Sequence, residues 1–525
     1  MTEGQIVAKK SPYIMGIDLG TSNSAIAVYV KGQAEIIPID GSKTLPSVFS
    51  VRNDGEILIG RQARNRALVD PDNTIASIKR EMGSDWKKEF KAISDKVYTP
   101  TDISGEILHK LLTGATEAGT VELRGEPAYA VVCIPANFND DQKTATKAAG
   151  ELANLEILYL LEEPVAAAIA YALDKERDQT ILVYDLGGGT FDVSILNVDS
   201  TKSDREKFDI LAKEGVPKLG GDDFDAKIMD IAGQKFHKES GVDIFDLKKD
   251  QGINKKALRQ AQQKLKDAAE KVKCELSETK AAMLEIPNLI KDDSGTVHNL
   301  DVEITRDEFN AAIAELIEQS KEAVDRALTS SKLTIEDIDR IILVGGSTRV
   351  PLVKEMLVEM FDKEPYADTD PDTAIARGAA IFASTLNVPE ADSERDSEDM
   401  RGEFEVSNIV THFLGIETRG GKFNRLIDKG LDIPAEEPLT FSKEYTTPRD
   451  NMTELAIRVY QSDQEADFVR NENVKCIGEF FLTRIPAKPR GEEKINVTFE
   501  IDQQNLLKVK ATSSSSTQEL EIKRS

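Results

Sequence analysis

Two segments of the chain repeat one another, and this repeat restricts the possible folds more than any other feature. Residues 13–30 read YIMGIDLGTSNSAIAVYV, and residues 181–198 read ILVYDLGGGTFDVSILNV. Each segment contains an apolar strand, an aspartate, a turn of small residues and a second strand, so Asp18 aligns with Asp185 and Gly20 with Gly187. Because an internal duplication builds two similar units, the repeat predicts an α/β fold of two lobes with a ligand between them.

The composition of both hairpins suits a bound triphosphate. Glycine lets backbone N–H groups approach phosphate oxygens closely, and one carboxylate on each hairpin can meet Mg²⁺ directly or through water. Either hairpin alone could be an ordinary glycine turn, but two copies with matching flanks favour a phosphate site. The chain has neither the P-loop pattern nor the dinucleotide fingerprint, and DLGGGT precedes a predicted strand rather than a helix.

A third glycine site and a long helix are candidates for holding a nucleoside. A predicted strand at residues 341–344 leads into Gly345 and Gly346, then Ser347 and Arg349, whose guanidinium could stack on a base. A tight turn is the alternative. A helix predicted over residues 254–277 presents three polar side chains on one face, where a solvated, salt-bridged helix is the alternative. These side chains are Glu270, Lys273 and Ser277.

Charge and cysteine content exclude several classes of protein. The formal net charge is −26, which disfavours binding to nucleic acid or to an anionic membrane. The three cysteines are widely separated and the four histidines lack metal-ligand spacing, so we expect a reduced compartment and no zinc site. The sequence shows no signal peptide and no apolar run long enough to span a bilayer, which predicts a cytoplasmic protein.

The periodicity of the chain changes once. Alternating strand and helix patterns extend to about residue 389, followed by a stretch (390–405) with eight acids and two bases. Beyond it the apolar residues alternate with a period of two, which predicts an antiparallel β-sandwich. We therefore expect three parts: a nucleotide-binding domain over residues 1–389, an acidic linker over 390–409, and a β-sandwich over 410–525.

These motifs together resemble the 70-kDa heat-shock chaperone family. The resemblance covers residues 13 to about 522 and rests on IDLGTSNS, VCIPANFNDDQKTATKAAG, EEPVAAAIAYALD, YDLGGGTFDVSIL, LGGDDFD, ILVGGSTRVP and PDTAIARGAA, and in the C-terminal part on LGIETRGGKFNRLI and PAKPRG. It implies an actin-like ATPase domain followed by a β-sandwich that binds extended polypeptides, and an ATP/ADP cofactor with Mg²⁺ and K⁺.

The resemblance also implies roles for individual residues. Asp18 and Asp185 would face Mg²⁺, Lys79 would stabilise the γ-phosphate, Glu163 would orient the attacking water, and Asp192 would support that network. The phosphate-binding residues would be Gly20, Thr21, Ser22, Asn23, Gly187, Gly188, Gly189, Thr190, Gly220 and Gly221. The adenosine-binding residues would be Glu270, Lys273, Ser277, Gly345, Gly346, Ser347, Arg349 and Asp372. The peptide-binding residues would be Ile416, Thr418, Arg419, Phe441, Leu455 and Ile457.

The sequence departs from the family pattern at several positions. The helical lid over the peptide groove is expected to be absent, and Asn408 stands where the linker usually has an acid, which argues against standard coupling between the domains. Arg419 replaces an apolar residue over the peptide and would favour acidic or narrower clients. Tyr159 replaces a basic residue used by J-domain partners, so such a partner is doubtful, whereas a nucleotide-exchange factor stays open.

Three functions therefore compete at this point. The first is an ATP-driven chaperone without a lid. The second is a nucleotide-switched adaptor for one dedicated protein, suggested by Arg419 and the altered linker. The third is a small-molecule kinase with the same core, which the C-terminal β-region disfavours.

Overall fold

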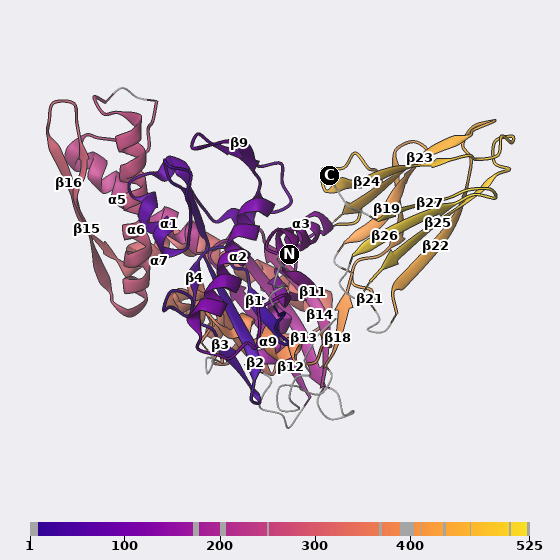
Figure 1. Ribbon diagram of the computed structural model, residues 1–525, viewed down its shortest axis with the longest axis horizontal. Coiled ribbons are helices and arrows are strands. Elements are labelled where there is room, and N and C mark those ends of the chain that lie inside the picture. The colour runs from indigo at the N-terminus through magenta and orange to yellow at the C-terminus, as the bar shows by residue number, and fades with distance from the viewer. Residues whose placement is uncertain are drawn as a thin grey trace, which may run out of the picture.

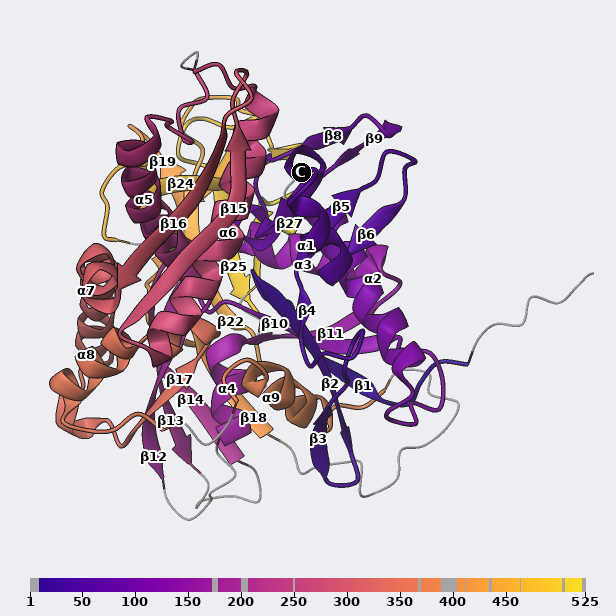
Figure 2. The same cartoon turned by 90° about the vertical axis from the view of Figure 1, so that its left-hand side faces the viewer.

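The computed structural model describes residues 9–171, 178–199, 206–248, 251–366, 370–388, 404–410, 412–433, 437–462, 464–502 and 506–521. The chain forms a large α/β part and a smaller all-β part, which lie side by side and meet near strands β14, β18 and β21 (Figure 1). Turned by 90°, the same structure shows helices α5, α6 and α7 with the β15–β16 hairpin on one side of the α/β part, and strands β5, β6, β8 and β9 on the other (Figure 2).

The first half of the α/β part contains a mixed sheet with the order β11-β10-β1-β2-β3, and β4 also pairs with β2. Strand β1 runs antiparallel to β2 and parallel to β10, which leaves Asp18 at the end of β1 beside the turn into β2. The strands are β1 (Ile14–Asp18), β2 (Asn23–Val30), β3 (Gln33–Ile36), β4 (Leu45–Pro46), β10 (Tyr129–Ile134) and β11 (Glu156–Glu162).

The second half repeats this arrangement. Strand β12 is antiparallel to β13 and parallel to β17, as β1 is to β2 and β10. The sheet has the order β17-β12-β13-β14-β18-β21 and thus includes two strands from beyond the α/β region. Its strands are β12 (Gln179–Leu186), β13 (Phe191–Asp199), β14 (Glu206–Val216), β17 (Arg340–Val344), β18 (Phe404–Ile409) and β21 (Asp432–Ile433).

Helices and short sheets complete each half. The predicted helix over residues 254–277 is confirmed as α6 (Lys255–Glu278), which buries its apolar stripe against β15 (Ala281–Lys291). The other helices are α1 (Arg61–Ala67), α2 (Pro100–Ala118), α3 (Asp140–Leu152), α4 (Glu163–Tyr171), α5 (Gly221–Ser240), α7 (Arg306–Ser331), α8 (Pro351–Phe361) and α9 (Ala374–Ala383). The remaining strands here are β5 (Val48–Val51), β6 (Ile57–Ile59), β7 (Thr74–Ala76), β8 (Lys88–Phe90), β9 (Ile93–Tyr98) and β16 (Val297–Thr305).

Helices α4 and α9 pack closely between the two sheets. Both are rich in alanine, and their side chains belong to one apolar core with strands of both halves. Gly378 of α9 lies so close to α4 that a Cβ built on it would stand 1.7 Å from the carbonyl oxygen of Ala166. The small residues thus permit direct backbone contact between the duplicated halves.

The C-terminal region consists of two four-stranded antiparallel sheets around a common apolar core, as the period-two pattern predicts. Their orders are β20-β19-β23-β24 and β22-β25-β26-β27. The strands are β19 (Phe413–Thr418), β20 (Lys422–Ile427), β22 (Leu439–Thr446), β23 (Glu454–Ser462), β24 (Val474–Thr483), β25 (Lys494–Ile501), β26 (Leu507–Thr512) and β27 (Thr517–Glu521).

The expected linker divides into two parts. Its acidic stretch up to residue 403 lies outside the described residues, whereas residues 404–409 form strand β18. This strand pairs with β14 on one side and with β21 on the other.

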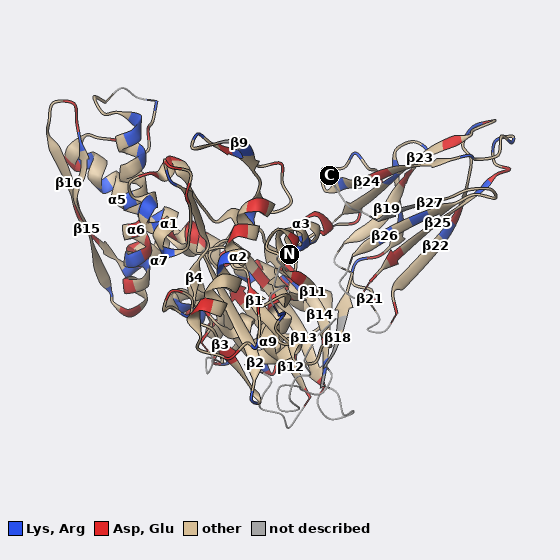
Figure 3. Cartoon of the chain, in the orientation of Figure 1, with Lys and Arg blue, Asp and Glu red and all other residues tan. Residues whose placement is uncertain are grey.

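Acidic and basic residues are interspersed over both parts of the molecule (Figure 3). None of the described helices has both the length and the apolar composition required to cross a bilayer.

The contact between α4 and α9 gives a first prediction. We expect Gly378→Ala to destabilise the α/β part by about 3 kcal/mol or more, because the added methyl group must displace backbone atoms of α4. The measurement is urea unfolding followed by the fluorescence of the single tryptophan, Trp86.

Gly233→Ala is the matched control in another helix. The atoms nearest to its added Cβ would all belong to the ring of Phe245, which is 40% exposed and free to move aside. We expect unchanged or slightly higher stability there, since alanine favours a helix more than glycine does. Equal unfolding midpoints for the two variants would contradict the close contact between α4 and α9.

Candidate functional site

The turns after the two aspartates meet in the groove between the halves. Asp18, Gly20, Asp185 and Gly187 line one small cavity, together with residues of both hairpins. Burial and the charge of Glu163 raise the pKa of Asp18 to about 7. The same two causes raise the pKa of Asp185 well above its ordinary range. The duplicated motif therefore brings two carboxylates together, Asp185 buried and Asp18 half-buried.

Lys79 supplies a buried positive charge at this point. It lies in the short helix Ile78–Glu81, and its ammonium group donates to Glu163 at 2.5 Å. Both side chains are less than one tenth exposed. Burial lowers the pKa of Lys79, but Glu163 and Asp18 more than compensate, so the pKa is raised and the side chain stays charged. Glu163 starts helix α4 directly after strand β11, which fixes its position.

Asp192 lies beside this group, on the strand opposite Asp185 in the β12–β13 hairpin. Its carboxylate accepts a hydrogen bond of 2.9 Å from the side-chain amide of Asn137. Burial and the charge of Glu163 nevertheless raise the pKa of Asp192 to about 7. Four carboxylates therefore lie near a single lysine, Lys79. This excess of negative charge favours a bound cation. The four are Asp18, Asp185, Asp192 and Glu163.

The glycine turns present backbone groups around the carboxylates. The β12–β13 turn closes through Gly187 N and Thr190 O at 3.2 Å, and Asp222 N at the start of α5 donates to Gly188 O. Gly345 has φ +83°, a conformation that favours glycine, and its Cα faces the carbonyl of Leu186. The predicted phosphate-binding residues that line the two cavities of the groove are Gly20, Thr21, Ser22, Asn23, Gly187, Gly188, Thr190 and Gly221. Gly189 packs against Thr21, and Gly220 packs against Gly188.

A larger cavity of about 340 Å³ adjoins the carboxylates. Ser347 donates to Gly187 O at 2.9 Å, and Arg349 forms ion pairs of 3.1 Å with Asp370 and Asp372. The predicted adenosine-binding residues that line it are Glu270, Lys273, Gly346, Ser347, Arg349 and Asp372. Gly345 lines the smaller cavity, while Ser277 lies one turn further along α6 and donates to Lys273 O.

Polar contacts beside this cavity join the two halves of the α/β part. Arg64 of α1 forms an ion pair with Glu270 of α6, and Arg259 forms one of 2.7 Å with Asp72. Ser77 donates to Asp222 at 2.6 Å. A ligand in the cavity is therefore surrounded by side chains from both halves of the chain.

The predicted peptide-binding residues of the C-terminal sandwich differ in how deeply they are buried. Ile416 and Ile457 are buried in the core between the sheets, and Phe441 and Leu455 are partly buried against the same core. Thr418 and Arg419 lie at the β19–β20 turn, where Arg419 is exposed.

The structure adds residues that the sequence did not single out. Cys274 lines the larger cavity one helical turn after Glu270, so the spacing along α6 could have indicated it. Arg64 and Asn137 could not have been found in this way, because each meets its partner only through the tertiary fold.

Comparison with known proteins agrees with this geometry. The family model described as Hsp70 protein matches residues 14–525. Chaperone protein DnaK of Thermotoga neapolitana is 42% identical over 508 residues, which are 96% of this chain and 79% of that protein. DnaK of Thermotoga maritima gives the same values, and DnaK of Thermosipho africanus is 41% identical over 96% of this chain and 78% of its own length. This chain therefore belongs to the Hsp70 family.

Proposed function

We propose that this protein is an ATP-dependent chaperone in which Asp18, Asp185, Lys79 and Glu163 carry out ATP hydrolysis. Membership of the Hsp70 family makes it an ATPase and a chaperone. The observation that carries the residue assignment is the cluster of carboxylates around the buried Lys79, between two equivalent hairpins. The duplicated sheets support the actin-like class for the ATPase domain, and the two packed sheets support a β-sandwich for the peptide-binding domain. We retain 1–389, 390–409 and 410–525 as the proposed domains.

Mg²⁺ fits the carboxylates at the base of the groove. One carboxylate oxygen of Asp185 is buried and has no hydrogen-bond partner among the described residues, which suits a cation or its water. Hard oxygen ligands of this kind, few in number, are typical of Mg²⁺. Asp18 and Asp185 would hold the ion, which would neutralise charge on the phosphates. We propose K⁺ near the same phosphates from the family resemblance alone.

Hydrolysis then proceeds by positioning and by electrostatic stabilisation. The ammonium group of Lys79 is placed to stabilise negative charge that develops on the γ-phosphate. Glu163 keeps Lys79 charged and can accept a hydrogen bond from the attacking water, while Asp192, hydrogen-bonded to Asn137, would support this network. The low exposure of this group keeps these interactions strong.

The C-terminal sandwich would bind extended polypeptide segments through backbone hydrogen bonds and apolar contacts. We propose Ile416, Thr418, Arg419, Phe441, Leu455 and Ile457 as its binding residues. We also propose a nucleotide-exchange factor as a partner and a cytoplasmic location. A J-domain partner stays doubtful because of Tyr159. The adaptor and kinase alternatives gain no support from the relatives, which are chaperones by name.

The role of Lys79 can be tested by substitution. We expect Lys79→Ala to lower the rate of ATP hydrolysis on the order of 10²–10³-fold, as expected when a charge-stabilising donor is removed, while ATP still binds. Single-turnover hydrolysis and a nucleotide titration measure the two effects separately. Lys87→Ala is the matched control, because Lys87 lies shortly after Lys79 in the sequence but is exposed. We expect this variant to hydrolyse ATP at the wild-type rate. Turnover of Lys79→Ala at the wild-type rate would remove Lys79 from the mechanism.

The role of Arg419 gives a prediction about clients. We expect apolar peptides flanked by acidic residues to bind more tightly than the same peptides flanked by lysines, and Arg419→Glu to reverse this order. The difference should be about two- to fivefold at low salt, because Arg419 is exposed and its charge is screened. Fluorescence anisotropy with a peptide pair measures it.

Lys475→Glu makes the same charge change on the same sheet, near the opposite end of β23 and β24. We expect this control to keep the wild-type order of the two peptides. An unchanged order in Arg419→Glu would separate Arg419 from client selection.

A further inference from the structure

Strand β18 physically joins the two domains. On one edge it runs parallel to β14 of the ATPase domain, with Glu206 opposite Phe404 and Asp209 opposite Ser407. On the other edge Asn408 and Ile409 pair with β21 of the C-terminal region. One continuous sheet therefore crosses the domain boundary, and the position of β18 determines how the domains meet.

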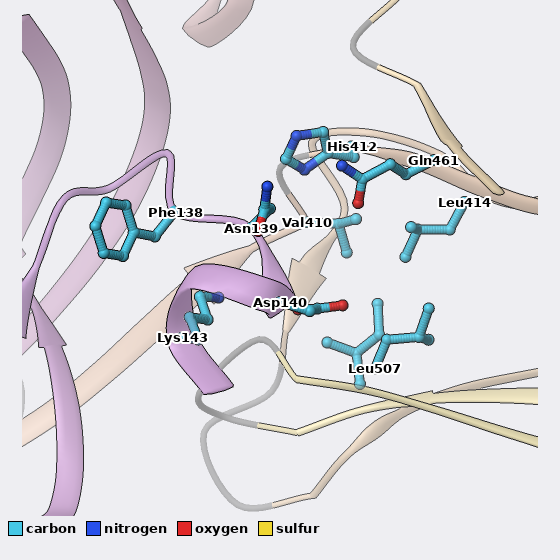
Figure 4. A pocket seen from close by; sticks show the side chains of 10 residues that line it. Phe138, Asn139, Asp140, Lys143, Val410, His412, Leu414, Gln461 and Leu507 are labelled. Atoms are coloured by element: carbon cyan, nitrogen blue, oxygen red, sulfur yellow. The ribbon is translucent and has the colours of Figure 1, made fainter. Parts of the chain in front are cut away.

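The domains also pack directly beside this strand. Residues at the start of α3 face Val410, His412 and Gln461 across a narrow space (Figure 4), and the cavity left between them is only about 20 Å³. Lys429 of the C-terminal region forms an ion pair of 3.2 Å with Glu214 of β14. The contact is therefore close and partly polar.

Three buried polar side chains, which we call the linker junction, hold β18 in place. Lys213 of β14 donates to Glu162 of β11 at 2.6 Å and also donates to the side-chain oxygen of Asn408. The amide group of Asn408 in turn donates to the same oxygen of Glu162 at 2.9 Å. The side chains of Lys213 and Glu162 are 1% and 6% exposed, so this pair is shielded from water.

Among the three side chains of the linker junction, the charges balance only when residue 408 is neutral. Lys213 provides one positive charge and Glu162 one negative charge. An acid at position 408 would lose the hydrogen bond donated to Glu162 and would place a second carboxylate within hydrogen-bond reach of the first. The other oxygen of Glu162 is already buried without a hydrogen-bond partner among the described residues, so Glu162 itself has no further donor to offset a second carboxylate beside it. Lys143 is the other positive charge that acts on Lys213: burial and then the charge of Lys143 lower the pKa of Lys213.

The linker junction also adjoins the catalytic group. Glu162 ends β11, and the next residue, Glu163, starts α4 and binds Lys79. A displacement of Glu162 must therefore move the backbone that carries Glu163.

We propose that Lys213, Glu162 and Asn408 position the linker strand on the ATPase domain, and that they transmit its position to Glu163. The acid needed by the buried lysine is supplied by the ATPase domain through Glu162, and the linker supplies a neutral amide. Lys213, Glu162 and Asn408 are thus positioning residues. Their effect on hydrolysis rests on the role proposed above for Glu163.

The test is an exchange of the acid and the amide between the two domains. We expect Asn408→Asp to place two carboxylates, those of residues 408 and 162, beside Lys213. We expect Glu162→Gln to leave Lys213 buried without its counter-charge. Each single variant should accelerate backbone hydrogen exchange in residues 404–409 at least about tenfold, because an uncompensated buried charge is strongly destabilising. The double variant Glu162→Gln/Asn408→Asp restores one acid and one amide, so its exchange should return to within about twofold of wild type.

The measurement is hydrogen exchange by mass spectrometry on the full chain without nucleotide. Asn496→Asp and Glu156→Gln are the controls, since both residues are exposed and the changes in charge are the same. Exchange in β25 and β26 reports whether each variant is folded. If Asn408→Asp fails to fold, Glu162→Gln and the double variant still give the comparison.

The turnover number for ATP is the second readout. It should change in the single variants and recover in the double variant, with the KM for ATP unchanged. The proposed role of the linker junction would be wrong if residues 404–409 of Asn408→Asp exchanged at the wild-type rate. It would also be wrong if the double variant exchanged as fast as the faster of the two single variants. The failure of the proposed function would look different, because the wild type would then show no ATP turnover. The exchange experiment needs no hydrolysis and would still test the linker junction.

Discussion

The crowding of carboxylates around one buried lysine is the constraint on which the rest of the structure depends. Burial, and then the negative charge of Glu163, raises the pKa values of Asp18, Asp185 and Asp192, which shows that four carboxylates so close together are costly to ionise. Lys79 relieves only part of this cost. A divalent cation at Asp18 and Asp185 would supply positive charge between these carboxylates and the nucleotide phosphates, so we expect a metal–nucleotide complex to stabilise the folded chain.

The sequence predicted those parts of the site that depend on local patterns. The duplicated hairpins, the helix over residues 254–277 and the period-two strands each follow from spacing alone, and the structure contains all three. The meeting of Arg64 with Glu270, and of Asn137 with Asp192, depends on how distant elements pack. Such contacts leave no local signal, because Arg64 and Asn137 each meet a partner that lies far away in the sequence.

The linker shows what a local interpretation leaves out. Asn408, read against the family pattern, argued against coupling of the domains. In the structure it is buried and bonded to both Lys213 and Glu162. The acid sought in the linker lies 246 residues earlier in the sequence, on strand β11. A departure at one position can be balanced by a side chain far away in the sequence, and only the fold reveals the pair.

The most direct test of the account is a calorimetric titration of the purified chain with ADP and ATP, in magnesium buffer and in buffer with EDTA. The account predicts saturable binding of one nucleotide per chain with Mg²⁺, much weaker binding without it, and loss of this difference in Asp18→Asn. Binding of the same strength in both buffers, or no binding in either, would contradict the central claim that the paired aspartates hold the cation of a metal–nucleotide complex.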